Sequence, residues 1–152
     1  MCGSCANEGA LKAAFMAYRA RERGEANQEG FSSDELSSCM KNATPGTPDL
    51  VALSFKSAFH GRLFGSLSLT RSKAIHKLDI PAFDWPAVSF PKMKYPLEEY
   101  EAENAESESR AIAEVEECIV EWAKKGKKVA ALIVEPIQSE VRVIESSIYF
   151  DL

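Results

Sequence analysis

The stretch VAALIVEP (residues 129–136) is a continuous apolar run that leads to a glutamate and a proline. Runs of this kind are typical of strands inside a parallel sheet, because helices cover both faces of such a sheet. We therefore predict a fully buried parallel strand here. Pro136 ends the strand, since proline has no N–H to donate to a neighbouring strand.

A long helix is predicted before this strand, from about residue 97 to residue 125. Its apolar residues recur at the spacing that places them on one face of a helix. Those residues are Ile112, Val115, Ile119 and Trp122. Glutamates gather early in the segment and lysines gather late, which matches the helix dipole, and Gly126 suits the C-terminal cap.

An earlier strand is predicted to begin near Leu50, in the apolar and partly alternating stretch 49–59. Between this strand and the long helix, the segment 81–96 carries four prolines, which exclude a long helix or a central strand. The aromatic side chains of that segment favour a loop packed on a surface. The order strand, helix, strand predicts an α/β fold built in layers.

The N-terminal sequence CGSC (residues 2–5) leads into a predicted helix from Asn7 to Arg23. Its two cysteines permit three interpretations: a redox dithiol at a helix N-terminus, half of a metal site, or two buried thiols. A zinc site has little support, because the sequence contains no second pair of ligands at a suitable spacing. Gly3 and Ser4 between the cysteines are suited to an anion, since N–H groups at the start of a helix lack partners within it.

The composition narrows the classes of partner. The chain has 152 residues, one domain's worth, and a net charge of −5, which argues against a nucleic-acid backbone as a partner. No apolar run reaches the roughly 18 residues that a membrane-spanning helix needs, so we expect no membrane partner. Four cysteines are too few for a secreted disulfide scaffold, which favours a compartment with reduced thiols.

Several segments resemble class III pyridoxal-phosphate aminotransferases, and they follow one another in the order that this family shows. The segments are CGSCANEGALK (2–12), FKSAFHGR (55–62), SKAIHKLDIPAFDWP (72–86), KYPLEE (94–99) and IVEPIQSE (133–140). The last three, and the Cys-Gly-Ser-Cys form of the first, are similar to the animal-type 4-aminobutyrate aminotransferases in particular.

The resemblance implies an incomplete α/β fold, namely part of the large domain of a fold type I pyridoxal-phosphate transferase with α/β/α layers. Residues 1–140 would form part of the cofactor-binding domain. Residues 141–152 depart from the family, and we interpret this tail as read-through of an intron, which an uninterrupted exon encoding the tail would contradict. The family also implies a homodimer and a location in the mitochondrial matrix.

The resemblance assigns the cofactor roles to five residues. Gly3 and Ser4 would hold the phosphate of pyridoxal phosphate. Phe59 would stack on the pyridine ring, and His60 and Glu140 would lie beside it. The lysine that forms the Schiff base with the cofactor is expected to be absent from this chain, so no catalytic residue is assigned.

The substrate and metal roles also come from the resemblance. Arg62 would bind the γ-carboxylate of 4-aminobutyrate, Lys73 would supply a second cation, and Glu135 would line the substrate site. Cys2 and Cys5 would supply two ligands of a [2Fe–2S] cluster, and the second subunit of the dimer would supply the other two.

These assignments imply transfer of the amino group of 4-aminobutyrate to 2-oxoglutarate, giving succinate semialdehyde and glutamate. The chain by itself is expected to be inactive. Two alternatives stay open at this point. The chain is either a non-catalytic truncated product, or a small redox protein that uses the dithiol of Cys2 and Cys5.

Overall fold

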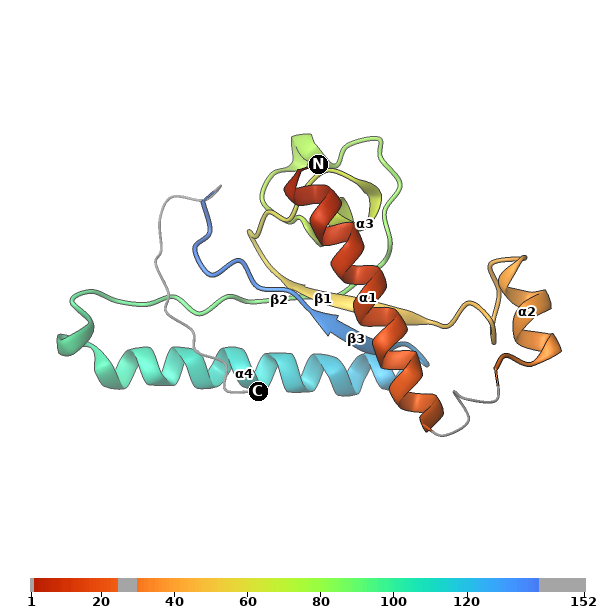
Figure 1. Cartoon of the computed structure of the whole chain (residues 1–152). Helices are drawn as coiled ribbons and strands as arrows, with labels where there is room; N and C mark the ends of the chain where they lie inside the picture. Colours follow the sequence, from red (N-terminus) through yellow and green to blue (C-terminus); the bar gives the residue numbers. More distant parts are fainter. Residues whose placement is uncertain (1, 25–29, 140–152) are drawn as a thin grey trace.

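The computed structural model describes residues 2–24 and 30–139 (Figure 1). The helices are α1 (Gly3–Arg23), α2 (Ser33–Cys39), α3 (Phe64–Leu69) and α4 (Glu101–Lys124), with short 3-10 turns η2 (Ala74–His76) and η3 (Leu97–Glu99). The strands are β1 (Leu50–Phe55), β2 (Ala87–Val88) and β3 (Lys128–Leu132). The fold is thus α/β, and Glu140 and the tail 141–152 lie outside the described residues.

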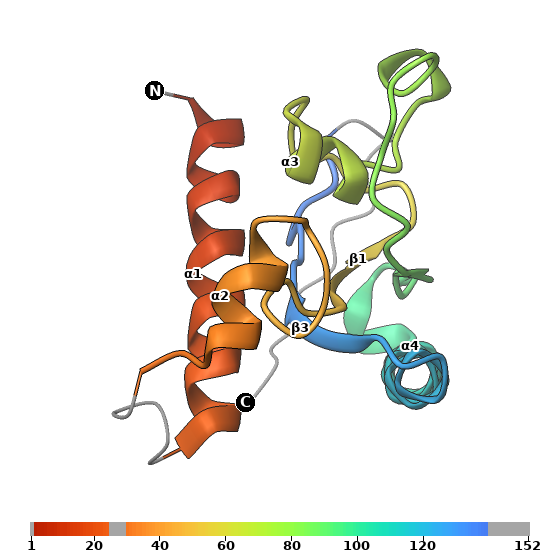
Figure 2. The same ribbon diagram turned by 90° about the vertical axis from the view of Figure 1, so that its right-hand side faces the viewer.

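The three strands form one parallel sheet in the order β2-β1-β3. Leu50 pairs with Lys128 and Leu53 with Leu132, with an irregularity after Val51. Figure 2 shows the sheet between two helical layers, with α1 on one side and α4 on the other. This arrangement confirms the predicted layered architecture.

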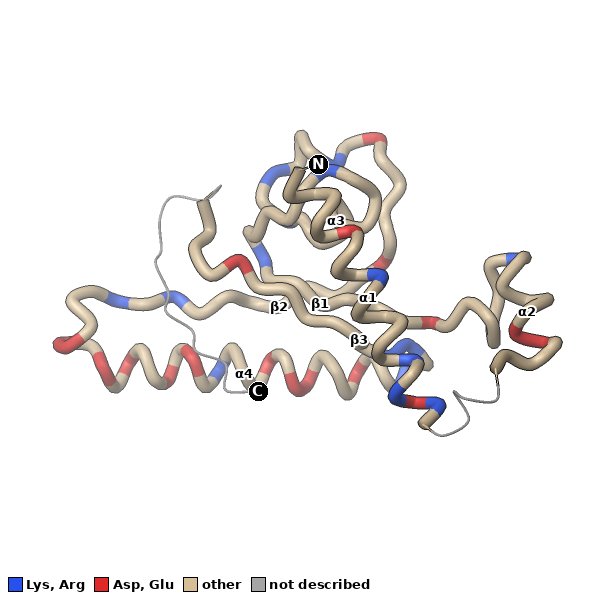
Figure 3. The backbone as a smooth tube through the Cα atoms, in the orientation of Figure 1, with Lys and Arg blue, Asp and Glu red and all other residues tan. Residues whose placement is uncertain are grey.

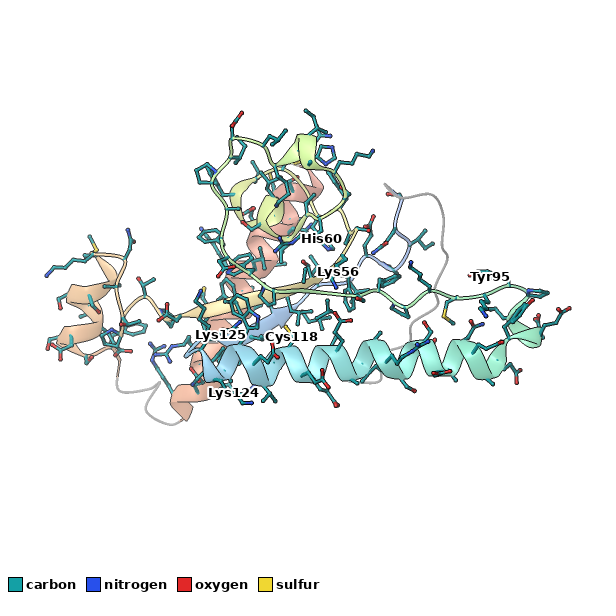
Figure 4. All side chains as sticks on the ribbon, turned by 180° about the vertical axis from the view of Figure 1, so that it is seen from behind. Lys56, His60, Tyr95, Cys118, Lys124 and Lys125 are labelled. Carbon is teal, nitrogen blue, oxygen red and sulfur yellow. The ribbon has the colours of Figure 1, made fainter. Side chains whose placement is uncertain are left out.

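Two clusters of buried side chains hold the layers together. The first joins Leu11 of α1 to Val51 and Ala52 of β1 and to Trp85, with Phe15 packed against it. The second cluster joins Leu53, Phe55, Ala58 and Val88, and Val115 and Cys118 of α4 pack against it. Figure 4 shows Cys118 on the side of α4 that faces the strands. Burial of these apolar surfaces is the main term that favours the fold.

A fully buried parallel strand was predicted at 129–136. The parallel orientation is correct, but the full burial is wrong. β3 is parallel to β1, but it ends at Leu132, and Leu132 is 41% exposed. The reason is its place at the edge: β1 borders it on one side, and no other described strand borders it on the other. A strand with one neighbour leaves part of its surface to solvent.

The apolar face predicted for the long helix is also only partly buried. Ile112 and Ile119 are 46% and 41% exposed, whereas Val115 and Trp122 pack against the core. The packed face is rotated toward Ala111 and Cys118, which lie next to Val115 on the helix surface. The spacing of the apolar residues predicted the helix correctly. The three-stranded sheet, however, covers a narrower face of α4 than the face that carries these residues.

The charges at the two ends of α4 follow the predicted pattern, with Glu101 and Glu103 in the first turn and Lys124 in the last. Figure 3 shows acidic residues along the length of α4, and basic residues where α1 ends and β3 begins. Within the described ranges, no helix combines the length and the apolar character that crossing a bilayer requires. The proline-rich segment 81–96 contains only the two-residue strand β2, at the edge of the described sheet, as its prolines predict.

Candidate functional site

The candidate site lies where the parallel strands end. β1 ends at Phe55 and β3 at Leu132, so the segments that follow them leave the sheet at the same edge. The N-terminus of α1 reaches the same place, because the backbone N–H of Arg62 donates to Ser4 Oγ at 3.3 Å. In open parallel sheets, ligands bind at this edge, beyond the carboxyl ends of the strands.

The turn after β1 approaches α1 so closely that one position must be glycine. Gly61 has φ +127°, a backbone conformation that other residues rarely adopt. A Cβ at this position would lie 2.4 Å from Ser4 Oγ and 2.8 Å from Ser66 Oγ. The missing side chain of Gly61 is therefore what allows the turn to meet the start of α1.

The start of α1 presents backbone N–H groups that have no carbonyl partner within the helix. The helix begins at Gly3, four residues before the predicted Asn7, so Gly3 and Ser4 belong to its first turn. Cys2 occupies the N-cap position, and its side chain makes no capping hydrogen bond. N–H groups in the first turn have no acceptor within the helix, and the helix dipole adds positive potential there, so the position suits a phosphate group.

Phe59, Arg62 and His76 form an aromatic and cationic cluster beside this helix start. The Arg62 guanidinium lies 5.7 Å from the centre of the Phe59 ring, and its Nη2 is 3.5 Å from His76 Nε2. The Phe59 and His76 rings meet edge to face at 5.3 Å. His76, on η2, was not among the predicted site residues, although it lies within the segment SKAIHKLDIPAFDWP that resembles the family.

His60 is buried within the turn and points inward. Its side chain lies at the end of β1, beyond Lys56 and away from α4 (Figure 4), and the residue is 6% exposed. His60 Nε2 has no hydrogen-bond partner among the described residues. Burial lowers the pKa of His60, although the negative charge of Glu135 partly opposes that shift. A buried polar atom without a partner needs an explanation, and a bound ligand is one.

The pKa shift of His60 gives the stability of the chain a pH dependence. The folded-state pKa of His60 lies below its ordinary value of about 6.5. The contribution of the neutral imidazole to the free energy of unfolding is therefore fully present above that pH, and it is lost as the pH drops through the folded-state pKa. We expect His60→Gln to reduce this loss, measured by urea unfolding at about pH 7.5 and about pH 5.5. If the unaltered chain and His60→Gln lose the same free energy of unfolding between the two pH values, His60 is not the source of the pH dependence.

Glu135 connects the segment after β3 to the turn. Its Oε2 accepts a hydrogen bond from the backbone N–H of Phe59 at 2.8 Å. Its Oε1 accepts from Ser139, from the backbone N–H at 3.2 Å and from the hydroxyl at 3.3 Å. Both carboxylate oxygens therefore hold protein groups, and Glu135 fixes the backbone of Phe59.

The remaining predicted residues lie at the margin of the cluster. Lys73 is exposed and caps η2, and its carbonyl accepts the N–H of His76 at 3.2 Å. Cys2 and Cys5 are exposed thiols whose Sγ atoms lie 3.7 Å apart. The backbone N–H of Cys5 is the largest cause of a lowered pKa for the Cys2 thiol, followed by the Cys5 thiol and the N–H of Ser4. Exposure excludes the interpretation of two buried thiols.

A protein-family comparison matches residues 1–150 to aminotransferase class III. The chain is 67% identical over 143 residues to the 4-aminobutyrate aminotransferase of Mycosarcoma maydis. The aligned region covers 92% of the chain and 28% of that relative. The chain is 60% identical over 139 residues to the mitochondrial 4-aminobutyrate aminotransferase of Homo sapiens, which covers 91% of the chain and 27% of the relative.

The comparison with solved structures also finds an aminotransferase. A lysine aminotransferase from M. tuberculosis superposes with a TM-score of 0.64 at 28% sequence identity, over 91% of this chain and 27% of that one. The chain thus spans just over a quarter of the length of the curated relatives it matches. With a match from residue 1 to residue 150, the chain belongs to the class III aminotransferase family.

Proposed function

We propose that this chain forms part of a pyridoxal-phosphate-dependent 4-aminobutyrate aminotransferase, which converts 4-aminobutyrate and 2-oxoglutarate to succinate semialdehyde and glutamate. The observation that carries the proposal is the contact between the start of α1 and the turn after β1, where Gly61 lies against Ser4. The names of the relatives, at 58–67% identity among the vertebrate and fungal proteins, support the substrate.

The residues at this contact fit the cofactor. The first-turn N–H groups at Gly3 and Ser4 would bind its phosphate, and the missing Cβ of Gly61 lets the turn after β1 lie directly against Ser4. Phe59 would pack against the pyridine ring, and the buried, neutral His60 would lie beside it with Glu140. When bound, pyridoxal phosphate supplies an electron sink for the reaction, whereas the protein supplies orientation.

The cationic cluster would bind the substrate. A guanidinium is always charged and presents paired donors, so Arg62 would clamp the carboxylate of 4-aminobutyrate. Phe59 and His76 both lie against that guanidinium. Lys73 would add positive charge to the approach, and Glu135 would act on the site by holding the backbone of Phe59.

We propose that the chain by itself catalyses no transamination, because the lysine that binds the cofactor covalently belongs to a part of the family outside residues 1–152. Lys56 binds Ser89 and Glu114 on the α4 side of the sheet, and Lys77 donates to the carbonyl of Leu67. Both ammonium groups are thus held by other partners. The homodimer, the mitochondrial matrix and the boundary at residue 140 belong to the same proposal.

Cys2 and Cys5 would supply half of a [2Fe–2S] cluster shared with a second subunit. Two exposed thiols 3.7 Å apart fit two ligands of such a cluster. In the part of the chain that the structure describes, no group of three or more potential ligands could hold a metal ion alone. A small dithiol redox function is the second candidate, and the same thiol contact favours it.

Anaerobic reconstitution with iron and sulfide separates these two functions of the cysteines. The cluster proposal predicts visible absorbance that accompanies dimerisation and is lost in Cys2→Ser. The dithiol function predicts instead that a monomeric chain reduces a protein disulfide and is itself oxidised to a Cys2–Cys5 disulfide. Absorbance without dimerisation would contradict a shared cluster.

The cofactor proposal is tested by binding of pyridoxine phosphate, which lacks the aldehyde and so does not react with surface lysines. We expect saturable binding by calorimetry, and pyridoxine without the phosphate should bind at least about tenfold more weakly, since the start of α1 would lose its anion. Equal affinities for the two ligands, or no binding of either, would overturn the proposed cofactor site.

A further inference from the structure

Three side chains on one face of α1 bind the segment that follows β1. Ser4, Asn7 and Glu8 are spaced at i, i+3 and i+4, so they lie together on the helix surface. Ser4 Oγ accepts from the N–H of Arg62 at 3.3 Å, and Asn7 Nδ2 donates to the carbonyl of His60 at 2.7 Å. Glu8 Oε1 accepts from the N–H of Ser66 at 2.7 Å.

Thr70 binds the same turn through a different pair of backbone groups. It is fully buried, and its Oγ1 accepts a hydrogen bond from the N–H of His60 at 2.9 Å. The carbonyls of Gly61 and Ser66 lie 2.8 Å and 3.0 Å from the same hydroxyl, within reach of its one proton. Thr70 is thus both acceptor and donor for two successive residues of the turn.

Asn7 and Thr70 together satisfy both backbone groups of His60. The N–H is held by Thr70 and the carbonyl by Asn7, on either side of one residue. The bond to Thr70 is buried and the bond from Asn7 is partly buried, and hydrogen bonds in such surroundings are costly to break, because the group that loses its partner has little access to water. The turn therefore has little freedom to move relative to α1.

The clamped residue lies between the parts of the proposed site. Phe59 precedes it, and Arg62 follows it after the glycine that contacts Ser4. A movement of the His60 backbone relative to α1 would change the distance from the first turn of α1 to the Phe59 ring and the Arg62 guanidinium. Ligand-binding groups must be held to about half an ångström to bind well, and the residues that hold them decide this.

We propose that Asn7 and Thr70 are positioning residues, which clamp the His60–Gly61–Arg62 turn onto α1 and so set the spacing between the phosphate-binding helix start and the residues that hold the ring and the substrate. This inference rests on the proposed function. It assigns Asn7 and Thr70 a role through the turn, and neither is required to touch the cofactor.

Two ligands of different reach test the clamp in the full 152-residue chain. Inorganic phosphate needs only the start of α1, whereas pyridoxine phosphate needs the helix start and the turn at the correct spacing. Thr70→Val keeps the shape and removes the hydroxyl, and Thr70→Ser keeps the hydroxyl. We expect Thr70→Val to weaken pyridoxine phosphate about tenfold and phosphate less than about twofold, and Thr70→Ser to bind both like the unaltered chain.

Asn7→Ala provides a second variant, at a half-buried position near the start of α1, and it removes the bond to the His60 carbonyl. We expect the same difference between the two ligands. Because both residues hold His60, the double variant Asn7→Ala, Thr70→Val should lose less affinity than the two single losses combined.

The outcomes separate this inference from the proposed function. Equal losses for phosphate and pyridoxine phosphate in Thr70→Val would show a merely structural role and overturn the inference. Unchanged binding of pyridoxine phosphate in Thr70→Val and Asn7→Ala would also overturn it, and would leave the cofactor site standing. If the unaltered chain binds neither ligand, the proposed function fails, and the positioning role fails with it.

Discussion

Gly61→Ala is expected to abolish binding of pyridoxine phosphate and to lower the free energy of unfolding by roughly 2 kcal/mol or more. Two effects act together. At φ +127° an alanine is strained, and its Cβ would lie 2.4 Å from Ser4 Oγ. Relief of this clash requires the turn to move away from α1, which separates the two halves of the site. Calorimetry for the ligand and urea unfolding for the free energy measure both effects.

Gly9→Ala is the matched control, because Gly9 lies inside α1 and a Cβ added there would meet no other atom within 4 Å. In a helix interior, alanine is favoured over glycine by about 1 kcal/mol, so this variant should be more stable and bind pyridoxine phosphate normally. Normal binding by Gly61→Ala would show that the contact between the turn and α1 is not part of the site.

Arg62→Gln is expected to lower the affinity for 4-aminobutyrate at least about thirtyfold, measured by NMR titration of the chain saturated with pyridoxine phosphate. The guanidinium would otherwise form charge-assisted hydrogen bonds with the carboxylate, in a position set by Phe59 and His76. The amide of 4-aminobutyrate has no carboxylate, so its weaker binding should change little in the same variant.

Arg110→Gln makes the same change in charge at an exposed position on α4, across the sheet from α1. It should leave the affinity for 4-aminobutyrate unchanged, which distinguishes a specific clamp from a general effect of net charge. An Arg62→Gln variant that binds the carboxylate and the amide as the unaltered chain does would remove Arg62 from the proposed substrate site.

Much of the fold follows from local pattern. The prolines between residues 81 and 96 restrict that segment, and the helical spacing of Val115 and Trp122 identifies α4. Burial was harder to predict, because it depends on neighbours. The apolar run from Val129 indicates a strand with covered faces, yet β3 borders only β1 among the described strands.

The candidate site shows the same division. The motif residues Ser4, Phe59 and Arg62 were predicted from the family resemblance, and the structure brings them to one edge of the sheet. Thr70 and His76 were not predicted, because their roles arise from contacts across 10 and 14 residues of chain with no periodic signal. The positive φ of Gly61 could have been suspected from the glycine, but its contact with Ser4 required the structure.

The central claim is that the start of α1 and the turn after β1 form one cofactor site. An NMR titration of the chain with pyridoxine phosphate tests it most directly, through the backbone amides. The proposal predicts that the amides of Gly3 and Ser4 and those of Phe59 to Arg62 shift together, saturably and with one dissociation constant. Shifts confined to the lysines at the end of α4, or to α1 without the turn, would contradict it.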